Sequence, residues 1–435
     1  MNWDSIFRFS GFKVKHVSLP KDDDKGVVRV HLVRKSEHSS LCYKCGSPLK
    51  TLHSHSKYQV EDSPILSHKV QLHFRRGKGR CDQCRKIRLE AIEFLSKANP
   101  KMTSRLSFLM YKFCEVAAVT RIAEIVDRNK MSLWRNDLLM LEMQYKNYRI
   151  PILSRISVDE VYAKGHHEEG ENHLDRFFTI ITCLKTHKVV GVEASRRKEA
   201  LDNFFRKLGP EGCALIEAVA TDEHDDYLRS VEEYCPNAIH ILDRFHLMRH
   251  FEEAINDTRK MLLKMLPQPA VRKLATGKFR YVFLKRDEKR TETERSHMAR
   301  VMKDNEAFTR LELIKERMIT FFDASTETEA LDILNEIDLW AKESGFPPIK
   351  KFCAKLKKKW VYLSNYFMCK ITTGVSEGIN NTIKALKRRA YGFRNMNYFM
   401  LKIMQVCGLM SSRYMDLDGN WTTAGKELLG LPLNH

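Results

Sequence analysis

The chain has 435 residues, of which 43% are hydrophobic, and a formal net charge of +20. This length is typical of two to four domains, and the hydrophobic content excludes an intrinsically disordered protein. The excess of lysine and arginine favours a polyanionic partner such as nucleic acid, because cations neutralise phosphates and release their counterions. A basic but otherwise ordinary enzyme is the alternative. No apolar run reaches the roughly 18 residues of a membrane span, and we expect no secretory signal because the first residues lack its basic segment and apolar core.

Residues 1–98 are predicted to form a small zinc-binding domain of short strands. Val27–Val33 and Val70–Phe74 alternate apolar and polar positions, as strands with one buried face do. Four of the 11 cysteines form two Cys-x-x-Cys pairs, and the others are scattered singly, which favours reduced thiols. The paired cysteines are Cys42, Cys45, Cys81 and Cys84. Four thiolates from two tight turns can hold Zn²⁺ tetrahedrally and stabilise a domain with a small core; unligated cysteines are the alternative. The histidines between the pairs could replace a thiolate: His53, His55, His68 and His73.

Residues 99–150 are predicted to form a helix-turn-helix domain. Pro100 and Thr103 precede a helical periodicity. Within residues 119–141, an apolar helix face is followed by the polar turn Asp127–Lys130 and by a second helix from Met131. A helix-turn-helix would direct polar residues of the second helix towards DNA, namely Ser132, Arg135 and Asn136. A plain helical hairpin is the alternative.

Residues 151–252 alternate strands and helices and are predicted to form the first part of a catalytic core. Apolar runs lead into Asp159, Asp222 and Asp243, which is typical of buried strands with a carboxylate at the tip. Two runs between residues 177 and 194 are predicted to pair as a hairpin, and the whole order of elements resembles the mixed sheet of an RNase H-like core. An aspartate at a strand end is also a common helix cap. This alternative applies to Asp243, and His246 could simply pack in the first turn of the following helix.

Residues 253–370 are predicted to be an all-helical insertion, because their apolar residues recur at helical spacing and no strand-like run is present. Residues 371–412 would complete the core with a helix that opens at Glu377, and residues 413–435 would form a C-terminal tail. At about 100° per residue this helix has an apolar stripe to pack on the sheet. The stripe contains Ile379, Ile383, Leu386 and Ala390. The opposite stripe, which would face the active site, contains Glu377, Asn381, Lys384 and Arg388. The predicted fold class is therefore α+β and multidomain.

Asp159, Asp222 and Glu377 together predict a magnesium site. Carboxylates at neighbouring strand tips, with one more from a helix, suit a pair of Mg²⁺ ions, or Mn²⁺ in their place. In a basic protein this site predicts phosphodiester chemistry on nucleic acid. A helix dipole also favours a carboxylate at the position of Glu377 without any catalytic role. The rival candidates for the second acid are Asp225, Asp226 and, most seriously, Asp243.

With these motifs the chain resembles bacterial insertion-sequence transposases of the DDE type, specifically the ISL-three family. The resemblance covers nearly the whole chain. It rests on the cysteine pairs, the helix-turn-helix and the blocks Ser157–Glu160, Asp243–His246, Glu377–Lys384 and Ala390–Asn395. It implies that Asp159, Asp222 and Glu377 form the catalytic triad, and that residues 253–370 are an insertion domain. It also implies that Asp243 and His246 form an Asp-x-x-His signature between the second and third acids.

The resemblance implies a transposase that binds the terminal inverted repeats of an insertion sequence, cuts the DNA with divalent metal and transfers the strands. A transposase-derived DNA-binding regulator without catalysis and a nuclease without strand transfer are the alternatives. Pairing two ends of double-stranded DNA implies a homodimer or larger assembly, located in the bacterial cytoplasm on the nucleoid. Basic residues such as Lys355–Lys359 would grip the DNA backbone. The other predicted DNA contacts are Arg75, Arg76, Asn381, Lys384, Arg388, Arg389 and Arg394.

Overall fold

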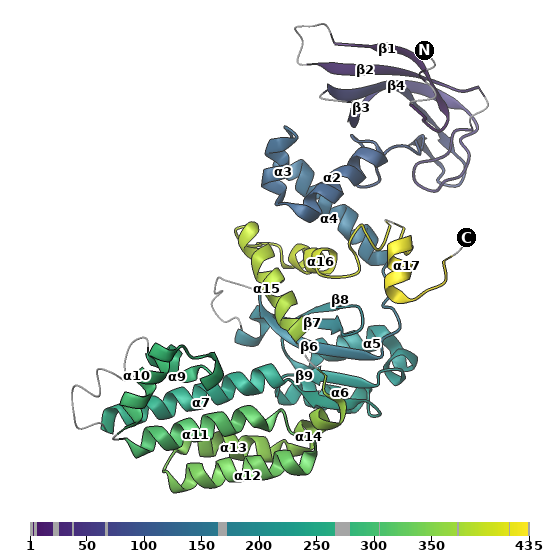
Figure 1. Cartoon of the computed structure of the whole chain (residues 1–435). Helices are drawn as coiled ribbons and strands as arrows, with labels where there is room; N and C mark the ends of the chain where they lie inside the picture. Colours follow the sequence, from purple (N-terminus) through teal and green to yellow (C-terminus); the bar gives the residue numbers. More distant parts are fainter. Residues whose placement is uncertain are drawn as a thin grey trace. The chain divides into compact units, whose positions relative to one another are not determined.

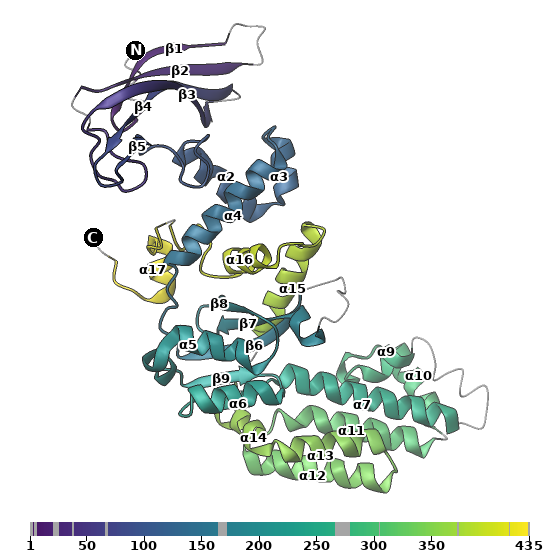
Figure 2. The same ribbon diagram turned by 180° about the vertical axis from the view of Figure 1, so that it is seen from behind.

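The computed structural model describes residues 3, 7–20, 26–36, 39–65, 68–163, 172–265, 279–303, 305–371, 374–416 and 418–433. The chain divides into two compact units, whose elements are labelled in Figure 1 and seen from behind in Figure 2. Unit 1 comprises Met1–Arg149 and Lys387–His435, and unit 2 comprises Ile150–Leu386. Unit 1 is therefore built from two separate segments of the chain, and the segment 371–412 is divided between the units after Leu386. No helix in the described ranges is both long and apolar enough to cross a membrane.

Unit 1 begins with a five-stranded sheet in the order β1-β2-β4-β3, with β5 paired to β4 (Figure 2). β2 and β4 run parallel, and the other neighbours are antiparallel. Alternating apolar side chains give the sheet one buried face, which packs on Phe9 and Phe94. The strands predicted at Val27–Val33 and Val70–Phe74 lie within β2 and β4. The strands are β1 Phe12–Ser18, β2 Val27–Arg34, β3 Leu52–Ile65, β4 His68–Cys81 and β5 Lys86–Leu89.

The helices of unit 1 come from both of its chain segments. They are α2 Ser104–Val116, α3 Val119–Ile125, α4 Lys130–Asn147, α16 Met396–Val406 and α17 Thr423–Leu429. Thr103 caps α2 at the predicted start, because its side chain accepts a hydrogen bond from the Leu106 N–H. A buried cluster joins α16 to α4: Asp137 Oδ2 lies 2.6 Å from the Tyr398 hydroxyl and 3.3 Å from Lys402 Nζ. Since breaking a buried ion pair costs about 3–5 kcal/mol, this cluster anchors the C-terminal segment on α4.

Unit 2 contains a second five-stranded sheet, in the order β10-β9-β6-β7-β8. Its strands are β6 Arg155–Tyr162, β7 Phe177–Cys183, β8 Lys188–Ala194, β9 Ala218–Thr221 and β10 Ile239–Leu242. β6, β9 and β10 are parallel, and β7 is antiparallel to both β6 and β8. The predicted hairpin is confirmed as β7 and β8. The prediction that the first strand ends at Asp159 is wrong, because β6 stays paired with β7 up to Tyr162 after its pairing with β9 has ended.

Two helices flank this sheet, α5 Lys198–Ala214 and α6 Asp225–Tyr234, and η1 is a short 3₁₀ turn at His173–Arg176. α5 is interrupted by a kink at Gly209. Gly209 has a φ of 80°, and helical turns resume after it, because glycine adopts positive φ without a steric penalty and Pro210 fits the first turn of a new helix. Gly191 on β8 allows α5 to pack closely, since a Cβ there would lie 2.6 Å from Phe204 Cδ2.

The described residues between 253 and 370 contain helices and no strand, as predicted. The helices are α7 Arg244–Met265, α9 Phe279–Leu284, α10 Glu292–Met302, α11 Glu306–Phe321, α12 Glu327–Glu343, α13 Pro347–Lys358 and α14 Trp360–Cys369, with η2 at Asp287–Lys289. The predicted apolar stripe of α11 is completely buried and comprises Phe308, Leu311, Ile314, Met318 and Phe321. One continuous apolar cluster connects this stripe to α7, α12, α13 and α14.

Helix α15 spans Gly374–Arg389 and starts three residues before Glu377, and its residues up to Leu386 belong to unit 2. Its two faces separate as the periodicity predicts. Ile379, Ile383 and Leu386 are buried, whereas Glu377 and Lys384 are exposed. The buried face also contains Ser376. A polar residue at this position indicates that the helix start packs on a polar part of the sheet.

Candidate active site and cysteine cluster

Three aspartates lie in one row across the parallel strands of unit 2. β6 pairs with β9 up to Val158↔Thr221, and β9 pairs with β10 up to Thr221↔Leu242. The next residue on each strand is an aspartate: Asp159 on β6, Asp222 after β9 and Asp243 after β10. Because parallel strands in register end at the same edge of a sheet, these carboxylates form a row at the carboxyl edge. Open α/β sheets commonly bind ligands at this edge.

Each aspartate of the row has a different set of hydrogen bonds. Asp159 accepts at Oδ1 from the Glu160 N–H at 2.7 Å and at Oδ2 from Asn380 Nδ2 at 2.6 Å. Asp222 accepts from the His224 N–H at 3.1 Å. Asp243 accepts from the Phe245 N–H at 2.8 Å, so it caps α7 as its alternative interpretation predicts.

His246 lies between two of these acids. Its Nε2 is 3.6 Å from Asp159 Oδ1 and 3.9 Å from Asp243 Oδ2, and its side chain is only 13% exposed. His246 follows Asp243 by three residues, and residues three apart share one helix face. The Asp-x-x-His spacing therefore directs both side chains towards Asp159.

Burial and mutual repulsion define the electrostatics of the row. Burial raises the pKa of the Asp159 carboxyl above its usual value, the neighbouring His246 opposes this shift, and the charges of Asp243 and Asp222 reinforce it. Burial also raises the pKa of Glu160 to about 7, with a further contribution from the Asp222 charge and opposition from Arg196. These acids repel one another in a poorly solvated site. A bound divalent cation would stabilise their charged forms.

The first turn of α15 is attached directly to β6. Ser376 Oγ lies 2.8 Å from Ser157 Oγ, and Asn380 reaches Asp159, so residues four apart on the helix meet residues two apart on the strand. Glu377 belongs to the same turn and is exposed. The sequence had singled out Asn381, which is exposed, and missed Asn380. The four-residue spacing from Ser376 on the buried helix face is the signal that could have identified it.

Two rival acids have other partners. Asp225 accepts from Lys359 Nζ at 2.6 Å, and Asp226 pairs with Arg229. Lys355 and Lys357 of the same basic run also contact carboxylates, those of Glu223 and Asp338, each at 2.6 Å. Lys355, Lys357 and Lys359 therefore each have an ion-pair partner within unit 2, whereas Lys358 is exposed.

The predicted DNA contacts differ in accessibility. The exposed ones are Arg75, Arg135, Asn381, Lys384, Arg388, Arg389 and Arg394, and Ser132 is half-buried. Arg389 donates to the Val116 carbonyl at 2.6 Å and so closes the end of α2. Asn136 and Arg76 are buried. Asn136 bonds Ser107, and Arg76 donates to the Glu90 carbonyl at 2.8 Å. A polar residue type does not reveal a buried polar partner, so the sequence did not indicate this burial.

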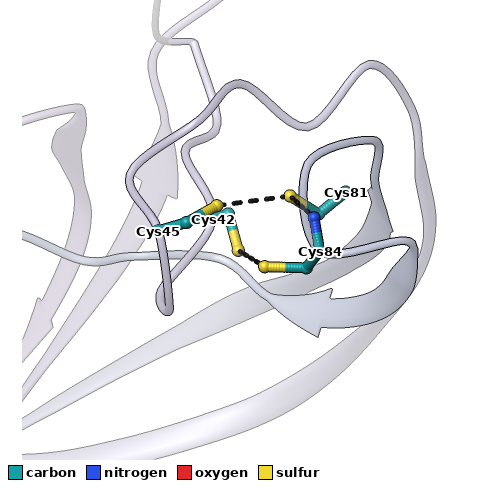
Figure 3. Close-up of side chains that lie close together, drawn as sticks. All are labelled: Cys42, Cys45, Cys81 and Cys84. Atoms are coloured by element: carbon teal, nitrogen blue, oxygen red, sulfur yellow. Dashed lines mark hydrogen bonds between the residues drawn. The ribbon is translucent and has the colours of Figure 1, made fainter.

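The four paired cysteines meet in unit 1, as Figure 3 shows. Their sulfur atoms all lie within 4.8 Å of one another, with Cys45 Sγ 3.4 Å from Cys81 Sγ and Cys42 Sγ 4.0 Å from Cys84 Sγ. Tetrahedral zinc with Zn–S bonds of about 2.3 Å requires sulfurs about 3.8 Å apart. Hydrogen bonds from the side chain and backbone of Ser47 lower the pKa of Cys45 to about 6, which favours the thiolate that zinc requires. The donor set thus fits structural Zn²⁺ with four cysteines and no histidine.

Comparison with known proteins agrees with this geometry. The family model for DDE transposases of the ISL3 type, described as Transposase, matches residues 156–403, which include the aspartate row and α15. The chain is 24% identical over 405 residues to the transposase for insertion sequence element IS1001 of Bordetella parapertussis, covering 92% of this chain and 96% of that protein. It is 27% identical over 268 residues to the transposase for insertion sequence element IS1557 of Mycobacterium tuberculosis, strain ATCC 25618 / H37Rv, covering 57% of this chain and 58% of that protein. The chain therefore belongs to the ISL-three family of insertion-sequence transposases.

Proposed function

We propose that the chain cleaves the ends of an insertion sequence and joins them to target DNA, with Asp159, Asp222 and Glu377 as its catalytic acids. The main support is the row of aspartates at the carboxyl edge of the sheet, together with the attachment of α15 to β6 through Asn380. This attachment places the helix turn that contains Glu377 on the strand that contains Asp159. Acids from two strands and one helix are the arrangement that two-metal phosphodiester chemistry needs.

We infer that the sheet of unit 2 is an RNase H-like core. The supporting features are the strand order β10-β9-β6-β7-β8, the antiparallel strand β7 between β6 and β8, and the helices α5 and α6 between strands. The helices α7 to α14 would then be an insertion between the second and third acids. We likewise infer that α3 and α4 form a helix-turn-helix, because they share a small core of Ile122, Ala123 and Leu133 and leave Arg135 exposed.

The residues of the row fit divalent metal. Asp159 and Asp222 would hold it with Glu377, since hard carboxylate oxygens are the ligands of Mg²⁺ and Mn²⁺. When bound, the metal supplies charge stabilisation and an activated water for attack on phosphorus. Asp243 would orient His246 instead of binding metal, because one of its oxygens caps α7 and the other faces the imidazole. Asn380 would fix the Asp159 carboxylate through its 2.6 Å hydrogen bond.

End cleavage with Mg²⁺ tests this assignment, using a DNA duplex that carries the inverted repeats flanking the gene. Asp159→Asn, Asp222→Asn and Glu377→Gln should each abolish cleavage without loss of DNA binding. Asp332→Asn alters an exposed aspartate on α12 and should cleave like the wild type. Wild-type cleavage by any of the three variants would refute the triad. If Asp243→Asn abolishes cleavage while Asp222→Asn retains it, the roles of these two acids are exchanged.

Two further assays separate the alternatives. Strand transfer from pre-cleaved ends distinguishes a transposase from a nuclease that only hydrolyses DNA. Footprinting of the element ends without any metal-dependent nicking would indicate a DNA-binding regulator. Because two DNA ends must be paired, we also propose a homodimer or larger assembly on DNA, which light scattering of the DNA complex measures directly.

A further inference from the structure

Three histidines form a continuous row across the sheet of unit 1. His16 on β1 pairs with His31 on β2, and His31 pairs with His73 on β4. The rings stack, with centroids 5.9 Å apart for His16 and His31 and 5.0 Å apart for His31 and His73. Strand alternation places this row on the face opposite the apolar core, because Val30 and Leu72, next to His31 and His73, are buried. None of these imidazoles belongs to the cysteine cluster.

The same face is strongly basic. Lys13, Arg29, Lys57 and Arg75 are all exposed, and their register with the histidine strands places them on this side. Within the described part of the chain, no carboxylate forms an ion pair with any of these four residues. We call this surface, made of the three histidines and these four cations, the histidine face. Glu61 also lies on it but is paired with Arg128. The surface is therefore a cluster of unneutralised cations around a row of titratable rings.

The histidine face continues into the proposed helix-turn-helix. Lys69 at its edge lies 2.7 Å from Asp127, and Arg128 binds Glu61, so the turn between α3 and α4 packs along β3 and β4. The turn leads directly into α4, which carries the exposed Arg135. All of these residues belong to unit 1. A ligand that contacts the start of α4 can therefore extend over the sheet.

We propose that the histidine face binds the phosphate backbone of duplex DNA beside the segment contacted by α4. The inference rests on the proposed function, because it extends the DNA-binding surface of a transposase. Charge complementarity identifies the occupant: a phosphate backbone matches four unpaired cations. A protein partner would require an apolar centre. Ser18, Gln59 and Gln71 lie opposite or beside the cations on this face, and its apolar residues on β2, Val27 and Val33, are half-buried.

The histidine row gives this contact a characteristic pH dependence. Burial lowers the pKa of His73, and the adjacent His31 and Arg29 lower it further. The charged and titratable groups on this face come from every neighbouring element. They are Lys13 and His16 on β1, Arg29 on β2, Lys57 and Glu61 on β3, Lys69 and Arg75 on β4, and Asp127 and Arg128 of the turn before α4, which pair with Lys69 and Glu61. Phosphates bound over the row would offset the repulsion between the protonated rings and the neighbouring cations, and would therefore raise the histidine pKa. Binding then takes up protons, so affinity rises as pH falls, by up to about tenfold for each histidine whose pKa increases by one unit.

The experiment measures the affinity of the full-length protein for a duplex of unrelated sequence, by fluorescence anisotropy between pH 6 and pH 8 at constant ionic strength. Wild-type protein should bind at least about tenfold more tightly at the lower pH. The triple variant H16Q, H31Q and H73Q should lose most of this dependence. H187N alters an exposed histidine in the turn between β7 and β8 and should retain it. Equal pH dependence in the triple variant and the wild type would overturn the proposal.

A second variant protects the test against misfolding. Arg29→Gln with Arg75→Gln changes only exposed side chains and should reduce the slope of log Kd against log salt by about two. An unchanged slope overturns the proposal even if the histidine variant fails to fold. If the wild type binds no duplex under any condition, the proposed function fails as well. If the variants change only the oligomeric state seen by light scattering, the face is instead an interface between copies of the chain.

Discussion

Replacing Asn380 with alanine tests whether the contact between α15 and β6 serves catalysis or only stability. The side chain donates from Nδ2 to Asp159 Oδ2 at 2.6 Å, while its own Oδ1 is buried and has no hydrogen-bond partner among the described groups. A hydrogen bond to a charged group contributes about 1.5–3 kcal/mol, and an unsatisfied buried acceptor costs about 1–3 kcal/mol. The alanine variant loses the stabilising hydrogen bond and also the cost of the unsatisfied acceptor, so we expect its free energy of unfolding to change by no more than about 2 kcal/mol.

Cleavage activity should decrease more than stability does. The hydrogen bond that orients Asp159 is lost, and removal of the unsatisfied acceptor does not restore that orientation. Loss of this hydrogen-bond energy corresponds to about a 10- to 150-fold decrease in any rate or metal affinity that depends on the orientation of the Asp159 carboxylate. Losses of 10- to 100-fold are also typical when the partner of a metal ligand is removed. We therefore expect a deficit of roughly 10- to 100-fold in end cleavage at limiting Mg²⁺, with partial recovery as Mg²⁺ is raised.

The assay is a titration of end cleavage with Mg²⁺, accompanied by urea unfolding of the same preparations. Thr382→Ala is the matched control, because Thr382 is exposed on the same helix and bonds only the Gly378 carbonyl. Asn380→Asp retains the shape but adds a negative charge beside Asp159, so it should cleave less than the alanine variant and shift the rate profile to higher pH. Wild-type cleavage by Asn380→Ala at limiting Mg²⁺ would refute the reasoning. A large loss of stability in that variant would instead assign the contact to the fold.

Two further predictions concern the cysteine cluster and the core of unit 2. Cys81→Ser should lower bound zinc from about one ion per chain and reduce the thermal stability of unit 1, whereas Cys369→Ser should leave both unchanged. Mass spectrometry measures the metal content, and thermal melting measures the stability. Full zinc retention by Cys81→Ser would contradict the site. His240 is buried on β10, and burial, assisted by the Lys359 charge, lowers its pKa to about 4. The native state then binds fewer protons than the unfolded chain between pH 4 and 6.5, so the free energy of unfolding should fall by up to about 3 kcal/mol as pH decreases through this window. His240→Phe should reduce this slope in urea unfolding at several pH values, and an unchanged slope would show that other groups cause it.

Local patterns in the sequence determined most elements of this protein. Apolar alternation predicted β2 and β4, and apolar runs predicted the strands of the second sheet. Helical spacing predicted the helices between residues 253 and 370, because these patterns reflect burial within a single element. The spacing of the cysteine pairs predicted their cluster in the same way. The acids at Asp159, Asp222 and Glu377 were identified because each adjoins a recognisable strand or helix.

The tertiary structure decided which of these residues meet. Insertion of β9 between β6 and β10 aligns Asp159, Asp222 and Asp243, and no local pattern specifies the order of strands in a sheet. Pairing with β7 extends β6 beyond Asp159. The helical segment lies between the second acid and α15 in the sequence, and only packing brings Asn380 back to Asp159.

Burial was the other property that required the structure. Arg76 and Asn136 have the side chains expected of DNA contacts, yet both are buried and form hydrogen bonds with other residues of unit 1. The histidine row shows the converse, because His16, His31 and His73 are widely separated in sequence and become neighbours only through strand register. The sequence by itself therefore determined the elements and the types of chemistry they contain. The tertiary structure decided the sites, because pairing between distant strands depends on the free energy of the whole fold and not on any single segment.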